Sequence, residues 1–174
     1  MTMDSNELVN KQITDLASNN EQTAFAAIKE LKRTGKEAVP SLIHALGEPG
    51  SLRTMAVVVL GELGQDAAEA VPALAELLLE DHEETQMATA LTLFRIGASS
   101  LPPLFSLVQR QESGTAFWAS WAIVMIDPKQ ASPGMIEVLN KERESSTSRI
   151  KPFAAEEALG KAIAAELEKQ GELE

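Results

Sequence analysis

The sequence contains no cysteine and no tyrosine, and only 4% of its 174 residues are aromatic. The absence of cysteine excludes disulfide scaffolds, thiol catalysis and cysteine-ligated metal sites. The shortage of aromatic residues disfavours a β-sandwich or barrel, whose strands are rich in aromatic and β-branched side chains. Ala, Leu and Glu are abundant instead, and these residues favour helices.

Basic residues are also scarce, because 15 Lys and Arg stand against 26 Asp and Glu and give a net charge of −11. This balance repels phosphate backbones and anionic lipids, so neither nucleic acid nor a membrane is expected as a partner. The sequence also lacks a secretory signal at residues 1–10 and the run of roughly 18 apolar residues that a spanning helix needs. These absences predict a cytoplasmic protein, and the length fits a single domain over residues 1–174.

Prolines recur along the chain at intervals of 32, 30 and 31 residues, at Pro40, Pro72, Pro102 and Pro133. Apolar residues follow each proline two, five and six positions later. This spacing places them on one face of a short helix that has proline in its first turn.

A second motif follows each of these helices and consists of an aliphatic anchor with a small residue four positions earlier and an aliphatic residue three positions later. The anchors are Ile28, Leu60, Leu93 and Ile123, with a looser fifth at Leu159. Gly64 and Gly97 come directly after two copies, where a helix would stop. Two helices in every 31 or so residues predict an all-α fold, a right-handed α-solenoid of four to five antiparallel helix pairs.

The ends of the domain differ from its repeats. We expect an N-terminal capping helix within residues 1–20, core repeats over 21–140, and a divergent last repeat with a C-terminal cap over 141–174. Asp4 and Glu7 have capping-box spacing at the start of the first helix. The polar stretch from Lys141 to Arg149 is expected to be a loop.

The best-defined copy begins at Leu52-Arg53 and continues through Ala56, Val59-Leu60-Gly61 and Leu63-Gly64 to Ala70-Val71-Pro72. It resembles a HEAT-like repeat of the phycobilisome-lyase type, and the resemblance covers roughly residues 21–163. The resemblance implies a protein-interaction scaffold, since only some members of that family are chromophore lyases or hydroxylases.

His82 and Glu83 are similar to the His-Glu pairs by which HEAT-repeat deoxyhypusine hydroxylases hold iron. That family repeats the pair over several helices, whereas the only other histidine here is His44, on a helix of the other type. Two separated histidines cannot assemble such a ligand set. The sequence also shows no serine, histidine and carboxylate set in a plausible context. We therefore predict no catalytic residues, no metal, no cofactor and no enzymatic activity.

An acidic run occupies a predicted turn and consists of Glu80, Asp81, Glu83 and Glu84. Acidic residues in the first turn of a helix are favoured by the helix dipole, which would make the run purely structural. The alternative is an acidic rim that attracts a basic partner. The run lacks the Asp/Asn spacing and the glycine of a calcium loop.

The second helix of each pair has an arc opposite its core side, and in a solenoid this arc lines the concave surface. The arc would normally be polar, but in the third and fourth copies it is apolar and continues to Phe153. The candidate groove residues are Val58, Met87, Leu91, Phe94, Phe117, Trp121, Val124 and Met125, whereas Trp118 falls on the core side.

Two interpretations of this stripe remain open. Either the C-terminal helix or a second copy covers it, which would make it core, or it is an exposed binding site. The leading hypothesis is a non-catalytic scaffold, monomeric or homodimeric, that grips an apolar segment of a protein or peptide with basic surroundings. The alternative, which rests on the resemblance, is a lyase or chaperone for a linear tetrapyrrole, with the pigment's propionates on Arg95.

Overall fold

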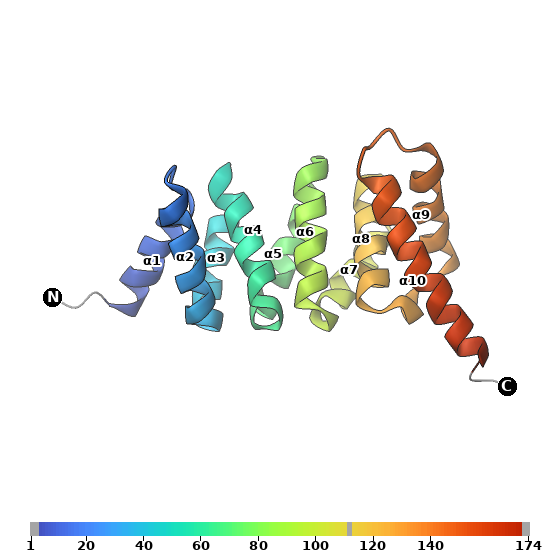
Figure 1. Cartoon of the computed structure of the whole chain (residues 1–174), viewed down its shortest axis with the longest axis horizontal. Coiled ribbons are helices and arrows are strands. Elements are labelled where there is room, and N and C mark those ends of the chain that lie inside the picture. Colours follow the sequence, from blue (N-terminus) through green and yellow to red (C-terminus); the bar gives the residue numbers. More distant parts are fainter. Residues whose placement is uncertain (1–3, 111–112, 172–174) are drawn as a thin grey trace.

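The computed structural model describes residues 4–110 and 113–171, and within this part of the chain all regular structure is helical. Ten α-helices follow one another as five antiparallel pairs in a single row (Figure 1). They are α1 (Ser5–Leu16), α2 (Glu21–Thr34), α3 (Val39–Leu46), α4 (Ser51–Leu63), α5 (Val71–Leu77), α6 (Glu83–Ile96), α7 (Leu101–Val108), α8 (Ser113–Ile126), α9 (Pro133–Ser145) and α10 (Lys151–Gly171). The predicted all-α solenoid is therefore confirmed.

The recurring prolines begin the short helices, as their spacing predicts. Pro40, Pro72 and Pro102 each lie in the first turn of α3, α5 or α7, and Pro133 is the first residue of α9. Proline is tolerated there because the first backbone N–H groups of a helix have no partner within the helix. A short 3₁₀ segment precedes each of these helices, at Gly35–Ala38, Gly64–Ala70, Ala98–Ser100 and Pro128–Gln130.

Glycine ends three of the longer helices. Gly35, Gly64 and Gly97 follow α2, α4 and α6 with φ angles of 67°, 56° and 89°, a left-handed conformation that side chains with a Cβ rarely adopt. The chain reverses direction at each of these glycines and continues through the 3₁₀ segment into the next short helix. After α8 the chain turns at Asp127 instead of a glycine. The Asp127 carboxylate accepts a hydrogen bond from the Lys129 N–H at 3.1 Å.

The helices form two layers, one of α1, α3, α5, α7 and α9 and the other of α2, α4, α6, α8 and α10 (Figure 1). The core lies between the layers and is continuous along the row. It is filled by fully buried leucines that alternate between the layers, among them Leu31, Leu42, Leu60, Leu74, Leu93 and Leu104. Each pair thus completes the core of its neighbour, as a solenoid requires.

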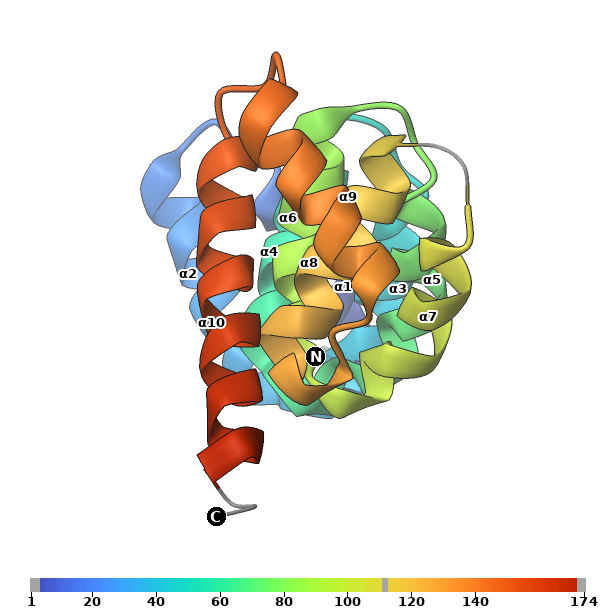
Figure 2. The same ribbon diagram turned by 90° about the vertical axis from the view of Figure 1, so that its right-hand side faces the viewer.

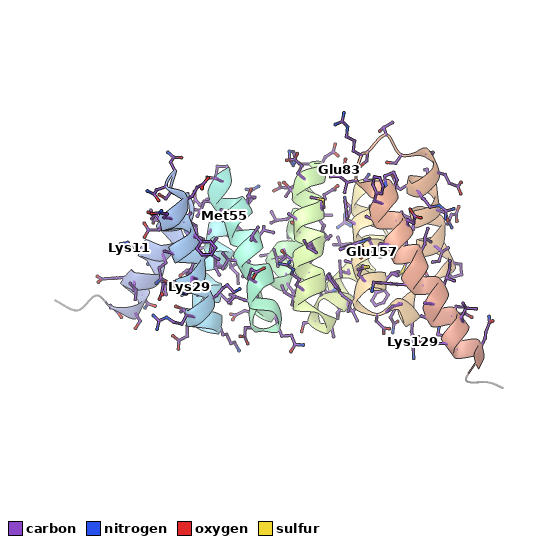
Figure 3. The ribbon with its side chains drawn as sticks, viewed as in Figure 1. Lys11, Lys29, Met55, Glu83, Lys129 and Glu157 are labelled. Carbon is purple, nitrogen blue, oxygen red and sulfur yellow. The ribbon has the colours of Figure 1, made fainter. Side chains whose placement is uncertain are left out.

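The second layer is not flat. In the end view, α2 and α10 lie further to one side than α4, α6 and α8 (Figure 2). We call the surface that α2, α4, α6 and α10 present on this side the concave face. Lys29 on α2 and Glu157 on α10 mark its two sides in Figure 3.

The expected loop from Lys141 to Arg149 is only half correct, because α9 continues through Ser145. Residues 141–144 are good helix formers, which favours continuation of the helix. Glu142, in this extension, pairs with Lys151 at the start of α10, with 3.6 Å between the carboxylate oxygen and Nζ. This contact holds the last two helices together where the chain turns.

Candidate functional site

Large apolar side chains project into solvent from three successive helices of the concave face. Val58 and Leu91 lie at the same position of α4 and α6, six residues before Gly64 and Gly97, and Phe25 of α2 lies one helical turn earlier in its repeat, ten residues before Gly35. Phe25 is 71% exposed, and Val58 and Leu91 are 39% and 40% exposed. Phe153 on α10 extends this row and is 74% exposed. Burial within the fold does not account for these four residues.

A charged row runs beside the apolar one. Glu62 on α4 accepts a hydrogen bond from Lys32 of α2 at 2.7 Å and another from Arg95 of α6, also at 2.7 Å. The hydrogen bond and charge of Lys32, with the nearby charge of Arg95, hold the pKa of Glu62 below its ordinary value. The Glu62 carboxylate therefore links α2, α4 and α6, which are neighbours in the second layer.

Two clefts lie on the concave face. The first, of about 350 Å³, lies between α2 and α4 and is lined by Phe25, Ile28 and Val58, with Lys29, Lys32 and Glu62 at its edge. The second, of about 390 Å³, lies where α6, α8 and α10 meet. Leu91, Met87 and Phe153 line this second cleft, and Trp121 forms part of its wall. The two clefts are mainly apolar and open to the same side.

Three predicted groove residues are not open to solvent. Phe117 and Val124 are fully buried, and Trp121 is 6% exposed. The reason is that α8 is surrounded by α6, α7, α9 and α10, of which α10 is displaced towards the concave side (Figure 2). The Lys151 ammonium of α10 lies 5.5 Å from the centre of the Phe117 ring. The C-terminal helix thus covers this part of the stripe, which is the first of the two interpretations that the sequence left open.

The buried residues Phe117, Trp118 and Trp121 form an aromatic cluster with the half-buried Phe94. Their rings meet edge to face, with 6.0 Å between the centres of Phe94 and Trp121, 5.0 Å between those of Phe117 and Trp118, and 5.8 Å between those of the two tryptophans. Trp118 is 1% exposed, in agreement with its predicted place on the core side. Edge-to-face pairs of this kind stabilise a core beyond the area they bury.

The other predicted groove residues retain access to solvent. Val58 and Leu91 are exposed, while Met87, Phe94 and Met125 are half-buried and pack against the core. The structure adds Phe25, which the sequence reasoning missed because it counted positions from the Ile28 anchor. Counting back from Gly35 instead places Ala27 and Leu31 on the core side and leaves Phe25 off it, which is the signal that could have found it.

The predicted acidic rim lies at one edge of the second layer, between α5 and α6. Glu80 pairs with Arg53, with 2.9 Å between Oε1 and Nη1, and Glu83 accepts a hydrogen bond from the Ser148 hydroxyl. Asp81 and Glu84 are exposed and form no ion pair within the described residues. Half of the run thus has a structural role, and the other half faces solvent.

His82 caps a helix in this structure. Its Nδ1 lies 3.3 Å from the backbone nitrogen of Thr85 and accepts that N–H at the start of α6. Within residues 4–110 and 113–171, no group of three or more His, Asp or Glu side chains is placed to hold a metal ion. In the same part of the chain, no helix is long and apolar enough to cross a membrane.

Comparison with known proteins places these features in a family. A family model for HEAT repeats matches residues 10–93. SkfG, an uncharacterized protein of Bacillus subtilis (strain 168), is 47% identical over 166 residues, which cover 95% of this chain and 97% of SkfG.

Two solved structures are also similar. An engineered protein from the Northeast Structural Genomics Consortium aligns with 90% of this chain and 79% of its own, at 19% identity and a TM-score of 0.51. A designed armadillo repeat protein in complex with the peptide (KR)4 aligns with 88% of this chain and 81% of its own, at 17% identity and a TM-score of 0.48. The chain therefore belongs to the same family as SkfG, and its residues 10–93 match HEAT repeats.

Proposed function

We propose that the protein is a non-catalytic scaffold that binds an apolar segment of a partner protein on its concave face. The observation that carries this proposal is the row of Phe25, Val58, Leu91 and Phe153, which projects into solvent beside two apolar clefts. Large apolar side chains that lie together on a surface and serve no packing need mark interaction sites.

The charge distribution favours a protein segment over a strongly charged ligand. The chain as a whole carries a net charge of −11. By contrast, the helices of the concave face, α2, α4, α6 and α10, together carry eight Lys or Arg and nine Asp or Glu, a net charge of −1. The free acids Asp81 and Glu84 at one edge would attract a basic residue that flanks the bound segment. The concave face itself favours contacts with apolar side chains of the partner.

The spacing of the row indicates the length of segment that fits. Packed helices lie about 8–10 Å apart, so Phe25, Val58 and Leu91 span roughly 16–20 Å. An extended segment covers that distance with about six residues and a helix with about 12 to 14. A short linear segment of a partner is therefore sufficient to contact all three helices.

The tetrapyrrole alternative gains no support from the site. Trp121 is covered by α10, and Arg95, the expected partner of a propionate, is engaged by Glu62. The HEAT-repeat match is to the repeat in general and carries no lyase function with it.

We test the proposal with a phage-displayed library of random 12-residue peptides, selected on the intact protein. Selected peptides are synthesised and titrated calorimetrically against the wild type, Leu91→Glu and Leu8→Glu. Leu8 lies on α1, away from the concave face, and is 42% exposed against 40% for Leu91, which makes it a matched control.

We expect Leu91→Glu to weaken binding at least about tenfold, as loss of a central apolar contact does. Leu8→Glu should bind as the wild type does. Failure to enrich any peptide, or equal affinities for the wild type and Leu91→Glu, would contradict the proposal.

A further inference from the structure

Helix α10 carries its larger apolar side chains on the outside. Its buried residues are mostly small, namely Ala155, Ala158, Ala162 and Ala165, with Leu159. Ile163 and Leu167, one helical turn apart, are 60% and 63% exposed. An end helix that served only to close the core would show the opposite distribution.

Ile163 borders a cleft between α9 and α10 at the end of the row, and Leu167 lies one helical turn further along α10. The cleft measures about 450 Å³ and is lined by Ile136, Leu159, Ala162 and Ile163, with Pro133 at one side. We call this surface the C-terminal end face. It faces the viewer in Figure 2 and is where a sixth pair would pack if the repeats continued.

The opposite end of the row, at α1, is mostly polar. The outer residues of α1 are polar, from Asp4 to Glu7 and on to Asn10 and Lys11, apart from Leu8. Figure 3 shows Lys11 on α1 at this end. A second copy packed head to tail would therefore bury the apolar end face against a polar helix, at a desolvation cost. Of the two ends of the row, only another C-terminal end face offers an apolar surface to cover it.

The charges around the cleft also suit such an arrangement. Arg143 and Lys169 lie on its rim together with Glu166, so both signs are present on one surface. In a two-fold dimer a residue away from the axis faces a different residue of the other copy, so Glu166, which lies 3.7 Å from Lys169 of its own helix, can also meet a basic group of the other copy.

We propose that the C-terminal end face is the interface of a two-fold homodimer, in which Ile163 and Leu167 of one copy pack against the same surface of the other. Helices of 13 and 21 residues, each about 10 Å in diameter, present a face of roughly 400–600 Å². This is below the about 800 Å² per partner of a standard interface, so the dimer dissociates on dilution. The part of each concave face formed by α2, α4 and α6 stays open in this dimer, because the end face is formed by α9 and α10.

Sedimentation velocity over a series of concentrations tests the proposal on the intact protein. The wild type should shift from monomer to dimer as concentration rises, and Ile163→Glu and Leu167→Glu should remain monomeric. Because both side chains are mostly exposed, the two variants should keep the wild-type melting curve in circular dichroism at low concentration.

Phe25→Ser is the matched control, since it removes an equally exposed large apolar side chain from α2 at the other end of the row. It should dimerise as the wild type does. A wild type that is monomeric at every concentration would overturn the proposal. Loss of the dimer in Phe25→Ser but not in Ile163→Glu would overturn it as well, because the concave face would then be the interface. The homodimer does not depend on the proposed peptide binding, so either proposal can fail alone.

Discussion

Gly61 shows how a single atom sets the distance between two helices. A Cβ added at this position of α4 would lie 2.9 Å from the Thr92 hydroxyl oxygen and 3.5 Å from Cδ of Arg95, both on α6. That hydroxyl donates a hydrogen bond to the Val57 carbonyl at 3.0 Å, which fixes it in place. Gly160 of α10 is also inside a helix, but a Cβ added there would meet no atom within 4 Å.

We therefore predict opposite signs for the same substitution at these two glycines. Gly61→Ala should destabilise the protein by about 1–3 kcal/mol, because the overpacking cost exceeds the gain in helix propensity. Gly160→Ala should stabilise it by about 0.5–1 kcal/mol. Urea unfolding of both variants measures the difference, and a stabilised Gly61→Ala would show that α4 and α6 can separate without cost.

Trp121 and Phe153 provide a second comparison at the residue scale, because they line the same cleft but differ in burial. We predict that Trp121→Ala costs about 3–5 kcal/mol of unfolding free energy, as truncation of a buried tryptophan does. Phe153→Ala should change it by less than about 0.5 kcal/mol. A Trp121→Ala variant as stable as the wild type would mean that α10 does not cover the aromatic cluster in solution.

At the scale of elements, Glu62 ties α2, α4 and α6 together through Lys32 and Arg95. Its pKa is lowered in the folded protein, so its contribution to stability is present above the ordinary pKa of a glutamate, about 4.3. The contribution disappears as the pH falls through the lower folded pKa, because protonation breaks both pairs. All three side chains are partly exposed, which limits each pair to about 0.2–1 kcal/mol.

We predict that Glu62→Gln is less stable than the wild type at pH 7 and that the difference is smaller at pH 3, below the ordinary pKa of a glutamate. Urea unfolding at both pH values measures the effect. Glu30→Gln is the control, because Glu30 pairs only within α2, with Arg33, and links no helices. A difference that persists undiminished at low pH would show that Glu62 acts through packing rather than through its charge.

At the scale of the whole molecule, the periodic sequence predicted the solenoid because local signals repeat in it. Pro40 and its equivalents mark helix starts, and Gly64 and Gly97 mark helix ends, so each repeat confirms the register of the next. These signals depend only on residues that are close together in the sequence, and the helices of the structure begin and end where the signals predict. Helix α10 departs from the pattern because its position depends on how it packs against α8 and α9, which no periodicity encodes.

The exposure expected of the groove residues is found where the repeats are regular and not where they end. Val58 and Leu91 are exposed on the predicted surface, where no neighbouring helix covers α4 and α6. Phe117, Trp121 and Val124 are buried because α8 also contacts α9 and because α10, the next helix of its layer, is displaced towards the concave side (Figure 2). One sequence feature points to this outcome, since residues 113–126 contain no charged residue, and a helix that is apolar all round is a buried one.

Both tryptophans lie in α8, and the chain has no tyrosine, so the strongly fluorescent side chains are confined to one part of the molecule. Intrinsic fluorescence excited in the tryptophan band arises entirely from Trp118 and Trp121, so it reports on the packing around α8 and is blind to α1 through α5. Circular dichroism, by contrast, sums over every helix. Comparing the two signals during one unfolding experiment therefore separates loss of the C-terminal half from loss of the N-terminal repeats, without any label being attached.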